Sequence, residues 1–167
     1  RVFMCGIAGI VWEDVKEFRP QIQRMKNSLR HRGPDGAADF FFQHCALAHT
    51  RLSIVDLFTG DQPMVDKKKK VGITFNGEIY GYQEIKKEFP DYSFKTTSDT
   101  EVILVLYQHY GERFLSKLPG MFAFAIWDDF QRKLVCARDR FGEKPFYYAI
   151  GEKGEFIFAS EIKTFFP

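Results

Sequence analysis

The sequence predicts a domain of the α+β class, with antiparallel sheets and a few separate helices. Two observations predict this class. Short apolar stretches recur along the chain, and most of them are connected by polar turns that are typical of β-hairpins. Helical spacing is confined to one stretch near the N-terminus and two in the middle of the chain. Many strands around a few helices, connected mainly by hairpins, indicate antiparallel sheets.

Strands are expected wherever short apolar runs end at turn residues. They are predicted at 3–12, 40–42, 46–54, 71–75, 121–127, 134–138, 146–150 and 155–159. Asp128-Asp129 and the stretch 152–154 are predicted to be hairpin tips. The lysine run 67–70 lies between two apolar stretches and is too short for an interaction tail, so a solvated hairpin tip is favoured over a partner-binding patch.

Helices are predicted at 20–30, 80–89 and from Ser98 up to Gly111. The third begins with the capping box S-D-T-E (98–101), in which the serine and the glutamate bind each other's backbone amides. The last residues, 160–167, begin a helical pattern that stops without an end signal, as at an artificial boundary.

The composition fits one globular domain and excludes several function classes. The 167 residues are 45% hydrophobic and include 19 phenylalanines, which is enough for a packed core. Lysine and arginine (24) nearly balance aspartate and glutamate (22), with the charges interspersed, so no nucleic-acid surface is expected. No apolar stretch approaches the roughly 18 residues of a membrane-spanning helix, so no membrane association is expected.

The three cysteines form no C-x-x-C pair, so neither a disulfide framework nor a zinc ribbon is predicted. No metal site is expected, and the chain is expected to be cytoplasmic. Cys45 and Cys136 lie inside predicted strands and are interpreted as buried structural thiols. Cys5 heads an apolar strand, where a buried thiol and a reactive thiol are both open interpretations.

Two other kinds of site are disfavoured. A papain-like protease would activate Cys5 with a histidine, but none of the four histidines has a recognisable local signature. The phosphate-binding pattern G-x-x-x-x-G-K-[ST] is absent, so this stretch is not expected to bind ATP.

The stretch F-N-G-E (75–78) follows an apolar strand and has two interpretations. Asn-Gly suits a type I′ hairpin turn. However, the residues that follow look helical and do not form a matching strand. Asn76 and Gly77 are therefore also candidates for a pair of donors that stabilise a developing oxyanion.

Arg51 and Asp99 complete the set of candidate site residues. Arg51 ends a predicted strand, where it forms either a surface ion pair or a two-pronged clamp for a carboxylate. Asp99 begins a helix, where it either interacts with the helix dipole or balances the charge of an ammonium group. With the Cys5 thiol and the Asn76–Gly77 donors, these residues supply what the cleavage of an amino-acid amide requires.

Motifs along nearly the whole chain carry a family resemblance. In order, they are M-C-G-I-A-G-I (4–10), R-H-R-G-P-D-G (30–36), A-H-T-R-L-S-I-V-D (48–56), F-N-G-E-I-Y (75–80), S-D-T-E-V-I-L (98–104), G-M-F-A-F-A-I-W-D (120–128), A-R-D-R-F-G-E-K-P-F-Y-Y (137–148) and F-A-S-E-I-K (158–163). The chain resembles the N-terminal glutaminase domain of glutamine-hydrolysing asparagine synthetases. That domain is a class II glutamine amidotransferase of the N-terminal-nucleophile hydrolase type. The leucine after Arg51 fits this pattern better than that of the phosphosugar and purine-pathway amidotransferases, which generally have an aromatic residue there.

The resemblance implies a four-layer αββα sandwich and a role for each candidate residue. Cys5 would attack the side-chain amide of glutamine and form a γ-glutamyl thioester, while Asn76 and the Gly77 amide would form the oxyanion hole. The remaining residues would bind the two ends of the amino acid. The α-carboxylate would be held by Arg51 with backbone groups of Leu52, Ser53, Ile54 and Val55, and the α-ammonium by Glu78 and Asp99.

The resemblance also implies partners. A C-terminal synthetase domain of the same polypeptide would activate aspartate with ATP and Mg²⁺ and receive the ammonia, so no cofactor is expected for this domain. A homodimer is possible. Two alternatives stay open: a non-catalytic glutamine-binding or regulatory domain, and an amidotransferase front domain that serves another acceptor, as in β-lactam-forming and cell-surface-modifying relatives.

The family's general base is the free α-amino group of the nucleophilic cysteine, which here would be blocked by Met4. A free α-amine has a pKa of about 7.7–8.0, whereas an amide nitrogen is not basic. Residues 1–4 are therefore interpreted as a leader or remnant before a glutaminase domain at 5–167. Residues left by cloning, a short processed leader and a natural block are the three explanations. Little activity is expected until residues 1–4 are removed.

Overall fold

The computed structural model describes residues 4–52, 60–68 and 70–166. Within these ranges, nine strands form two antiparallel sheets. The five-stranded sheet has the order β2-β3-β1-β9-β8, with β1 (Gly6–Val11), β2 (Gly36–Phe41), β3 (Cys45–Arg51), β8 (Tyr147–Ile150) and β9 (Phe156–Ala159). The four-stranded sheet has the order β4-β5-β6-β7, with β4 (Met64–Asp66), β5 (Val71–Ile79), β6 (Gly120–Asp128) and β7 (Lys133–Arg138).

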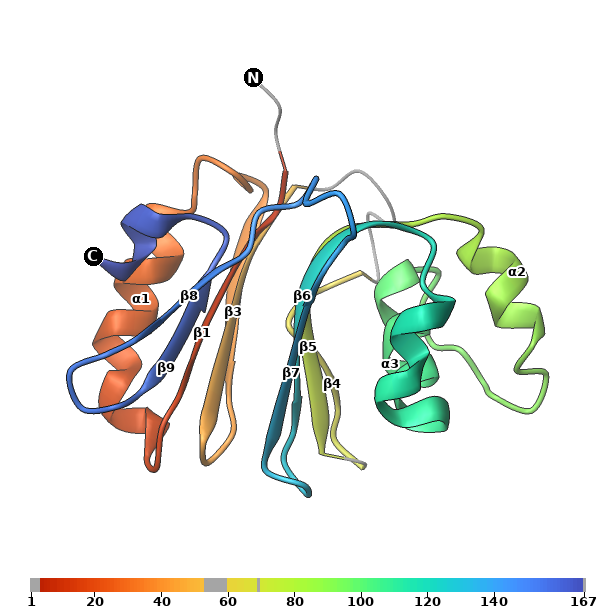
Figure 1. Cartoon of the computed structure of the whole chain (residues 1–167), viewed down its shortest axis with the longest axis horizontal. Coiled ribbons are helices and arrows are strands. Elements are labelled where there is room, and N and C mark those ends of the chain that lie inside the picture. Colours follow the sequence, from red (N-terminus) through yellow and green to blue (C-terminus); the bar gives the residue numbers. More distant parts are fainter. Residues whose placement is uncertain (1–3, 53–59, 69, 167) are drawn as a thin grey trace.

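The two sheets pack face to face between helices, which gives four layers (Figure 1). Helix α1 (Arg19–Ser28) covers the outer face of the five-stranded sheet, and α3 (Asp99–Tyr110) covers that of the four-stranded sheet, with α2 (Tyr82–Lys87) beside it. Three 3₁₀ turns are also present: η1 (Val15–Phe18), η2 (Gly111–Lys117) and η3 (Ile162–Phe165). This αββα arrangement is the fold class that the sequence predicted.

Strand alternation divides the core into three apolar layers. In β3, Ala46 and Ala48 pack toward α1, while Cys45 and Leu47 pack between the sheets. In β5, Ile73 and Phe75 pack toward α3. Because both faces of these strands are buried, they appear in the sequence as nearly continuous apolar runs.

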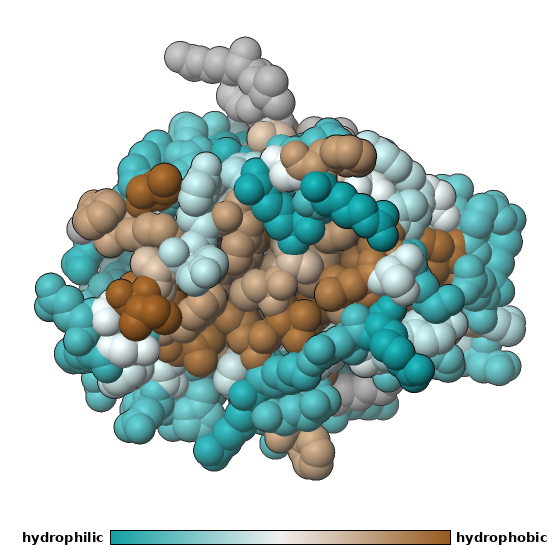
Figure 2. Space-filling view, in the orientation of Figure 1, coloured by the Kyte–Doolittle hydropathy of each residue, from teal (hydrophilic) through white to brown (hydrophobic). Residues whose placement is uncertain are grey.

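The side of the sandwich that faces the viewer in Figure 1, where both sheets are seen edge-on, has no helix of the described part of the chain over it. Figure 2 shows a band of apolar surface across the middle of this side. Large exposed apolar side chains include Tyr148 and Ile150 of β8, which is an edge strand, and Phe141 in the preceding loop. Some of the apolar side chains of β8 therefore lie on the surface of the domain and not in its core.

All the predicted strands are present, but two differ in extent: β2 spans Gly36–Phe41 where 40–42 was predicted, and β5 is longer than predicted. The short β4 was missed, because three residues show no measurable periodicity. Strand β5 continues to Ile79, so the prediction of its end at residue 75 and the hairpin-turn interpretation of F-N-G-E are wrong. The reason is the partner strand: β6 pairs with β5 as far as Ile79↔Gly120. The end of the predicted strand 46–54, beyond Leu52, lies outside the described residues.

The capping box is confirmed in its first half only. The Ser98 hydroxyl accepts a hydrogen bond from the Thr100 amide (3.1 Å) and caps α3. The Glu101 carboxylate does not accept the backbone amide of Ser98, as the second half of a capping box would require. This buried carboxylate instead accepts the amides of Lys95 (3.0 Å) and Thr96 (2.7 Å), because the preceding loop folds over the start of the helix.

The predicted hairpin tips are confirmed. The lysine run separates β4 from β5, residues 128–129 lie at the β6–β7 turn, and residues 152–154 lie between β8 and β9. Cys45 is fully buried and Cys136 is partly buried, and both are free thiols inside strands. Within the described residues, no helix is long and apolar enough to cross a membrane.

Candidate active site

A cavity of about 300 Å³ lies at the end of the sandwich where β1 begins and where β3 and β5 end. Every predicted site residue that the structure describes lines it: Cys5, Arg51, Leu52, Asn76, Gly77, Glu78 and Asp99. Ser53, Ile54 and Val55, the other predicted members, lie outside the described residues. Residues from four separate parts of the sequence are thus brought to one cavity by the packing of the two sheets.

Cys5 lies immediately before β1, and its thiol faces the end of β3. The Leu52 amide donates to its sulfur (3.3 Å), and the thiol donates to the Leu52 carbonyl oxygen (3.6 Å). Burial raises the pKa of the Cys5 thiol, and the Leu52 amide and the charges of Arg51 and Arg32 only partly oppose this. The thiol is therefore protonated near neutral pH, and its use as a nucleophile requires a base.

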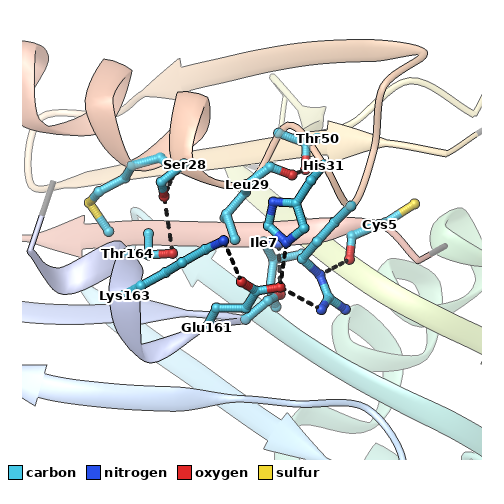
Figure 3. Close-up of polar contacts among 12 residues, drawn as sticks. Cys5, Ile7, Ser28, Leu29, His31, Thr50, Glu161, Lys163 and Thr164 are labelled. Carbon is cyan, nitrogen blue, oxygen red and sulfur yellow. Dashed lines mark hydrogen bonds and ion pairs between the residues drawn. The ribbon is translucent and has the colours of Figure 1, made fainter. Parts of the chain in front are cut away.

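Arg32 fixes the backbone at Cys5 and was not predicted as a site residue. Its Nε donates to the Cys5 carbonyl oxygen (3.1 Å) and its Nη1 to Glu161 (3.0 Å). Figure 3 shows the Glu161 carboxylate beside His31 and Lys163, which contact it together with Arg32. Burial raises the pKa of Glu161, but its bonds to Arg32, His31 and Lys163 outweigh burial and lower it overall. Arg32 of the R-H-R motif therefore holds the backbone of Cys5 in place.

Asn76 supplies a buried donor to the cavity. It lies in β5, is 3% exposed, and its Nδ2 has no hydrogen-bond partner among the described residues. An unsatisfied buried donor costs roughly 1–3 kcal/mol, so its retention at a cavity is typical of a functional site.

Gly77 follows Asn76 where β5 approaches β6 closely. A Cβ at Gly77 would lie 2.2 Å from the Met121 carbonyl oxygen, and its φ of +156° is one that side chains rarely adopt. Glycine is therefore required at this position for the backbone that positions Asn76.

Arg51 projects its guanidinium to the cavity from the end of β3. Its Nη1 donates to the Asp61 carboxylate (2.7 Å); the Arg51 side chain is 15% exposed, whereas that of Asp61 is 88% exposed. The ion-pair interpretation of Arg51 is thus correct for this structure. Asp61 is not among the residues that line the cavity, so the carboxylate-clamp role of Arg51 stays a prediction.

Asp99 and Glu78 supply two carboxyl groups to the cavity. Asp99 is buried at the start of α3, and its Oδ2 accepts the Ile79 amide (3.0 Å). Burial raises the pKa of Asp99; the amides of Ile79, Thr100 and Asp99 itself lower it, and the charge of Glu78 raises it. Glu78 is exposed at the rim.

The cavity residues that the sequence analysis did not predict include His49, Gln62 and Lys144. His49 lies two residues before Arg51, so strand alternation, which places both on one face, could have indicated it. Gln62 accepts the Phe75 amide (2.6 Å) and donates to Thr100 (3.3 Å). Lys144 is buried, with its Nζ 3.0 Å from the Met4 sulfur, and nothing in the local sequence predicts this position.

Within the described residues, no group of three or more histidine, cysteine, aspartate or glutamate side chains is arranged to hold a metal ion. The sulfur of Cys5 also has no hydrogen bond to a histidine among the contacts described above. The chemistry that this cavity can perform is therefore derived from its thiol, its amide donor and its charged walls.

The fold and the cavity define a class of protein: a four-layer αββα domain with a thiol and a buried amide donor in a small charged cavity. A family model described as glutamine amidotransferase domain matches residues 4–167, so the chain belongs to this family. The predicted family resemblance is thereby confirmed.

The relatives narrow the family further. Asparagine synthetase [glutamine-hydrolyzing] 2 of Oryza sativa subsp. japonica is 44% identical over 163 residues, which are 96% of this chain and 28% of that protein. Asparagine synthetase B [glutamine-hydrolyzing] of Escherichia coli (strain K12) is 41% identical over 167 residues, which are 98% of this chain and 30% of that protein. The chain thus spans about three-tenths of these relatives.

A solved structure supports the fold. Glutamine phosphoribosylpyrophosphate amidotransferase from B. subtilis, in complex with ADP and GMP, superposes with a TM-score of 0.76 and is 24% identical. The similarity covers 96% of this chain and 43% of that chain. At this identity it shows the shared fold alone, which confirms the predicted fold class.

Proposed function

We propose that this domain hydrolyses the side-chain amide of glutamine to glutamate and ammonia. The observation that carries the proposal is one cavity with a thiol at Cys5, an unpartnered amide donor at Asn76, a guanidinium at Arg51 and a buried carboxylate at Asp99. These groups complement the reacting amide and the two charged ends of a free amino acid.

The proposed reaction has two stages. The Cys5 sulfur attacks the carboxamide carbon (Cδ) of the glutamine side chain, while Asn76 Nδ2 and the Gly77 amide stabilise the oxyanion. The thiol proton is passed through a base to the amide nitrogen, which leaves as ammonia when the C–N bond breaks. Water then attacks the thioester carbon, the C–S bond breaks, and glutamate and the thiol are released.

The substrate is proposed to lie between Arg51 and the acidic wall. Its α-carboxylate would replace that of Asp61 on the Arg51 guanidinium, since Asp61 is an exposed and exchangeable partner. Leu52, with Ser53, Ile54 and Val55, is proposed to contribute backbone contacts. The α-ammonium would lie between Asp99 and Glu78, where burial of Asp99 strengthens the attraction.

The base is proposed to be the α-amino group of Cys5 in a chain that begins there. The raised thiol pKa makes a base necessary. Of the described groups, the hydrogen-bond partners of the sulfur are the backbone groups of Leu52, and neither is basic. With Met4 attached, the nitrogen of Cys5 is an amide and cannot accept the proton.

The test compares a chain that begins at Cys5 with one that retains residues 1–4. We expect glutamate and ammonia to be released by the first and little or none by the second. The control is Cys5→Ala in the shorter chain, which should be inactive. Rapid turnover by material whose intact mass includes all four preceding residues would contradict the α-amine mechanism. An inactive shorter chain that is folded would contradict the proposed function.

We also propose that the ammonia supplies a synthetase domain of the same polypeptide that amidates aspartate, with ATP and Mg²⁺ used there. The names of the relatives and their threefold greater length support this.

Free cysteines support a cytoplasmic location. No nucleic-acid or membrane partner is proposed, and a homodimer is to be tested by light scattering. Growth of an asparagine auxotroph that expresses the full-length protein tests the acceptor, and failure with intact glutaminase activity would indicate another acceptor.

A second candidate is a non-catalytic glutamine-binding domain. One contact favours it: Met4 lines the cavity, and its sulfur contacts the buried Lys144, so the residue that blocks Cys5 is part of the wall. A glutamine-analogue electrophile distinguishes the two functions in the chain that begins at Cys5. Covalent labelling of the thiol supports the enzyme, and glutamine binding without labelling supports the second candidate.

A further inference from the structure

The cavity wall contains a second buried polar atom without a partner. Four buried side-chain nitrogen or oxygen atoms in the described part of the chain lack a hydrogen bond, and two of them belong to cavity residues: Asn76 Nδ2 and His49 Nε2. The first is a donor. Whether the second is a donor or an acceptor depends on the tautomer of the His49 ring.

The contacts of Thr74 determine that tautomer. The Thr74 hydroxyl lies 3.0 Å from the Ala48 carbonyl oxygen, which can only accept, so the single hydroxyl proton is donated there. The same oxygen lies 3.2 Å from His49 Nδ1 and must accept from it. Nδ1 therefore carries the ring proton, and Nε2 presents a bare lone pair.

The ring is also neutral. Burial and, to a smaller extent, the nearby charge of Arg51 lower the pKa of His49 to about 3. Nε2 is thus an acceptor across the pH range in which a glutaminase would operate. With this pKa it is a poor proton acceptor for the Cys5 thiol, which agrees with the disfavoured cysteine–histidine mechanism.

The two unpartnered atoms come from opposite sheets. His49 lies in β3 of the five-stranded sheet, two residues before Arg51. Asn76 lies in β5 of the four-stranded sheet, two residues after Thr74, to which His49 is bonded. Both residues line the same cavity, and Thr74, which is bonded to His49, lies two residues, about 7 Å, from Asn76 along β5.

We infer that His49 Nε2 accepts an N–H of the substrate's carboxamide and selects glutamine over glutamate, an inference that rests on the proposed function. A primary carboxamide has one acceptor oxygen for Asn76 and N–H donors for His49, so it satisfies both unpartnered atoms. A carboxylate has only acceptors and places a negative oxygen against the Nε2 lone pair. The same contact orients the amide before attack and disfavours retention of the product.

The test measures binding in a Cys5→Ala chain, so that turnover and the α-amine play no part. Calorimetry gives the affinities for glutamine and glutamate. His49→Asn keeps a side-chain N–H for Thr74 but has no acceptor at the Nε2 position, and we expect the glutamine-over-glutamate preference to fall about tenfold or more. His49→Gln can place its oxygen near that position, and we expect it to retain most of the preference. The exposed His109→Asn is the matched control and should leave the preference unchanged.

A second measurement is independent of ligand. Nitrogen-15 NMR of the histidine rings should show His49 as the neutral Nδ1–H tautomer at pH 7, and an Nε2–H or charged ring would overturn the inference. If folded His49→Asn keeps the full preference for glutamine, the role of His49 is wrong while the proposed function stands. If the Cys5→Ala chain binds neither amino acid, the proposed function fails and the inference fails with it.

Discussion

Asn76 shows at the scale of one residue how a candidate site residue can oppose stability. Its buried amide donor has no hydrogen-bond partner in the described part of the protein. The same holds for the acceptor at His49. Such groups are costly in a folded chain and are kept where a ligand satisfies them. Two predictions belong to this scale.

We expect Asn76→Ala to lower kcat by about 10²–10³ while glutamine binding is largely retained, because the amide is needed when charge develops on the oxygen. The free energy of unfolding should not fall by more than it does for the exposed Asn27→Ala, since an unsatisfied donor is removed. Kinetics, calorimetry and urea unfolding of a chain that begins at Cys5 measure these quantities. A large loss of binding with unchanged kcat would show that Asn76 holds the ground state instead.

We expect Arg51→Ala to raise the KM for glutamine about ten- to a hundredfold with a smaller change in kcat, since a charge-assisted carboxylate contact is lost. Asp61→Ala is the matched control, because it removes the observed partner and leaves the guanidinium in place. Its KM should stay the same or fall. An unchanged KM in Arg51→Ala would remove the carboxylate-clamp role.

At the scale of an element, the positions of two cavity residues depend on hydrogen bonds at the start of a helix and within a loop. Helix α3 starts at a serine cap, which places Asp99 on the cavity wall. The loop that carries Lys144 is closed by Asp139, whose carboxylate accepts the amides of Glu143 (2.9 Å) and Lys144 (3.0 Å). Each element therefore positions a site residue through one short polar side chain.

We expect Ser98→Ala to reduce the free energy of unfolding by about 1 kcal/mol, because the hydroxyl that caps the Thr100 amide is lost. Urea denaturation measures this change. Ser116→Ala, an exposed serine outside α3, is the control and should change stability by less than half as much. Equal effects of the two substitutions would show that the cap contributes nothing.

We expect Asp139→Asn to lower the free energy of unfolding at pH 7. The substitution should also make that free energy depend less on pH in the acid range. Burial raises the pKa of Asp139, but the amides of Lys144, Glu143, Phe122 and Phe141 outweigh burial and lower it overall. The unfolded carboxyl, near pKa 3.9, therefore binds protons more readily than the folded one. The stabilisation by the ionised Asp139 carboxylate is complete above about pH 4 and is lost as the pH falls through the folded pKa. Urea unfolding between pH 7 and 3 should show a smaller acid loss in Asp139→Asn than in the exposed Asp91→Asn.

At the scale of the whole molecule, the layer between the sheets makes the domain one cooperative unit. Phe158 of β9 is fully buried there with Trp127 of β6, and it stacks on Phe146 with ring centroids 5.6 Å apart. This layer also sets the separation of the two sheets, and hence the distance across the cavity between β3 and β5.

We expect Phe158→Ala to destabilise the domain by about 3–5 kcal/mol, since a large core side chain is removed. Both sheets should still unfold in one transition, and fluorescence of Trp12 and Trp127 should coincide with circular dichroism. Phe130→Ala, at a residue 87% exposed, is the control and should be nearly neutral. Separate transitions for the two probes would contradict the coupling of the sheets through this layer.

The sequence by itself determined the features that depend on neighbouring residues. Apolar runs and turn residues predicted most of the strands and three hairpin tips, and Ser98 predicted the start of α3, because hydrogen bonding and side-chain alternation act over a few residues. The motifs also gave the family and the candidate residues that line the cavity, through resemblance to known sequences. The roles of those residues remain predictions.

Only the tertiary structure decided what depends on partners far along the chain. Strand β5 continues through F-N-G-E because β6 pairs with it, and Glu101 turns away from Ser98 because a loop offers it buried amides. His49 and Lys144 reach the cavity through the packing of two sheets and a loop. No local pattern encodes such contacts, since the free energy that selects them comes from the burial of surfaces that meet only when the chain has folded.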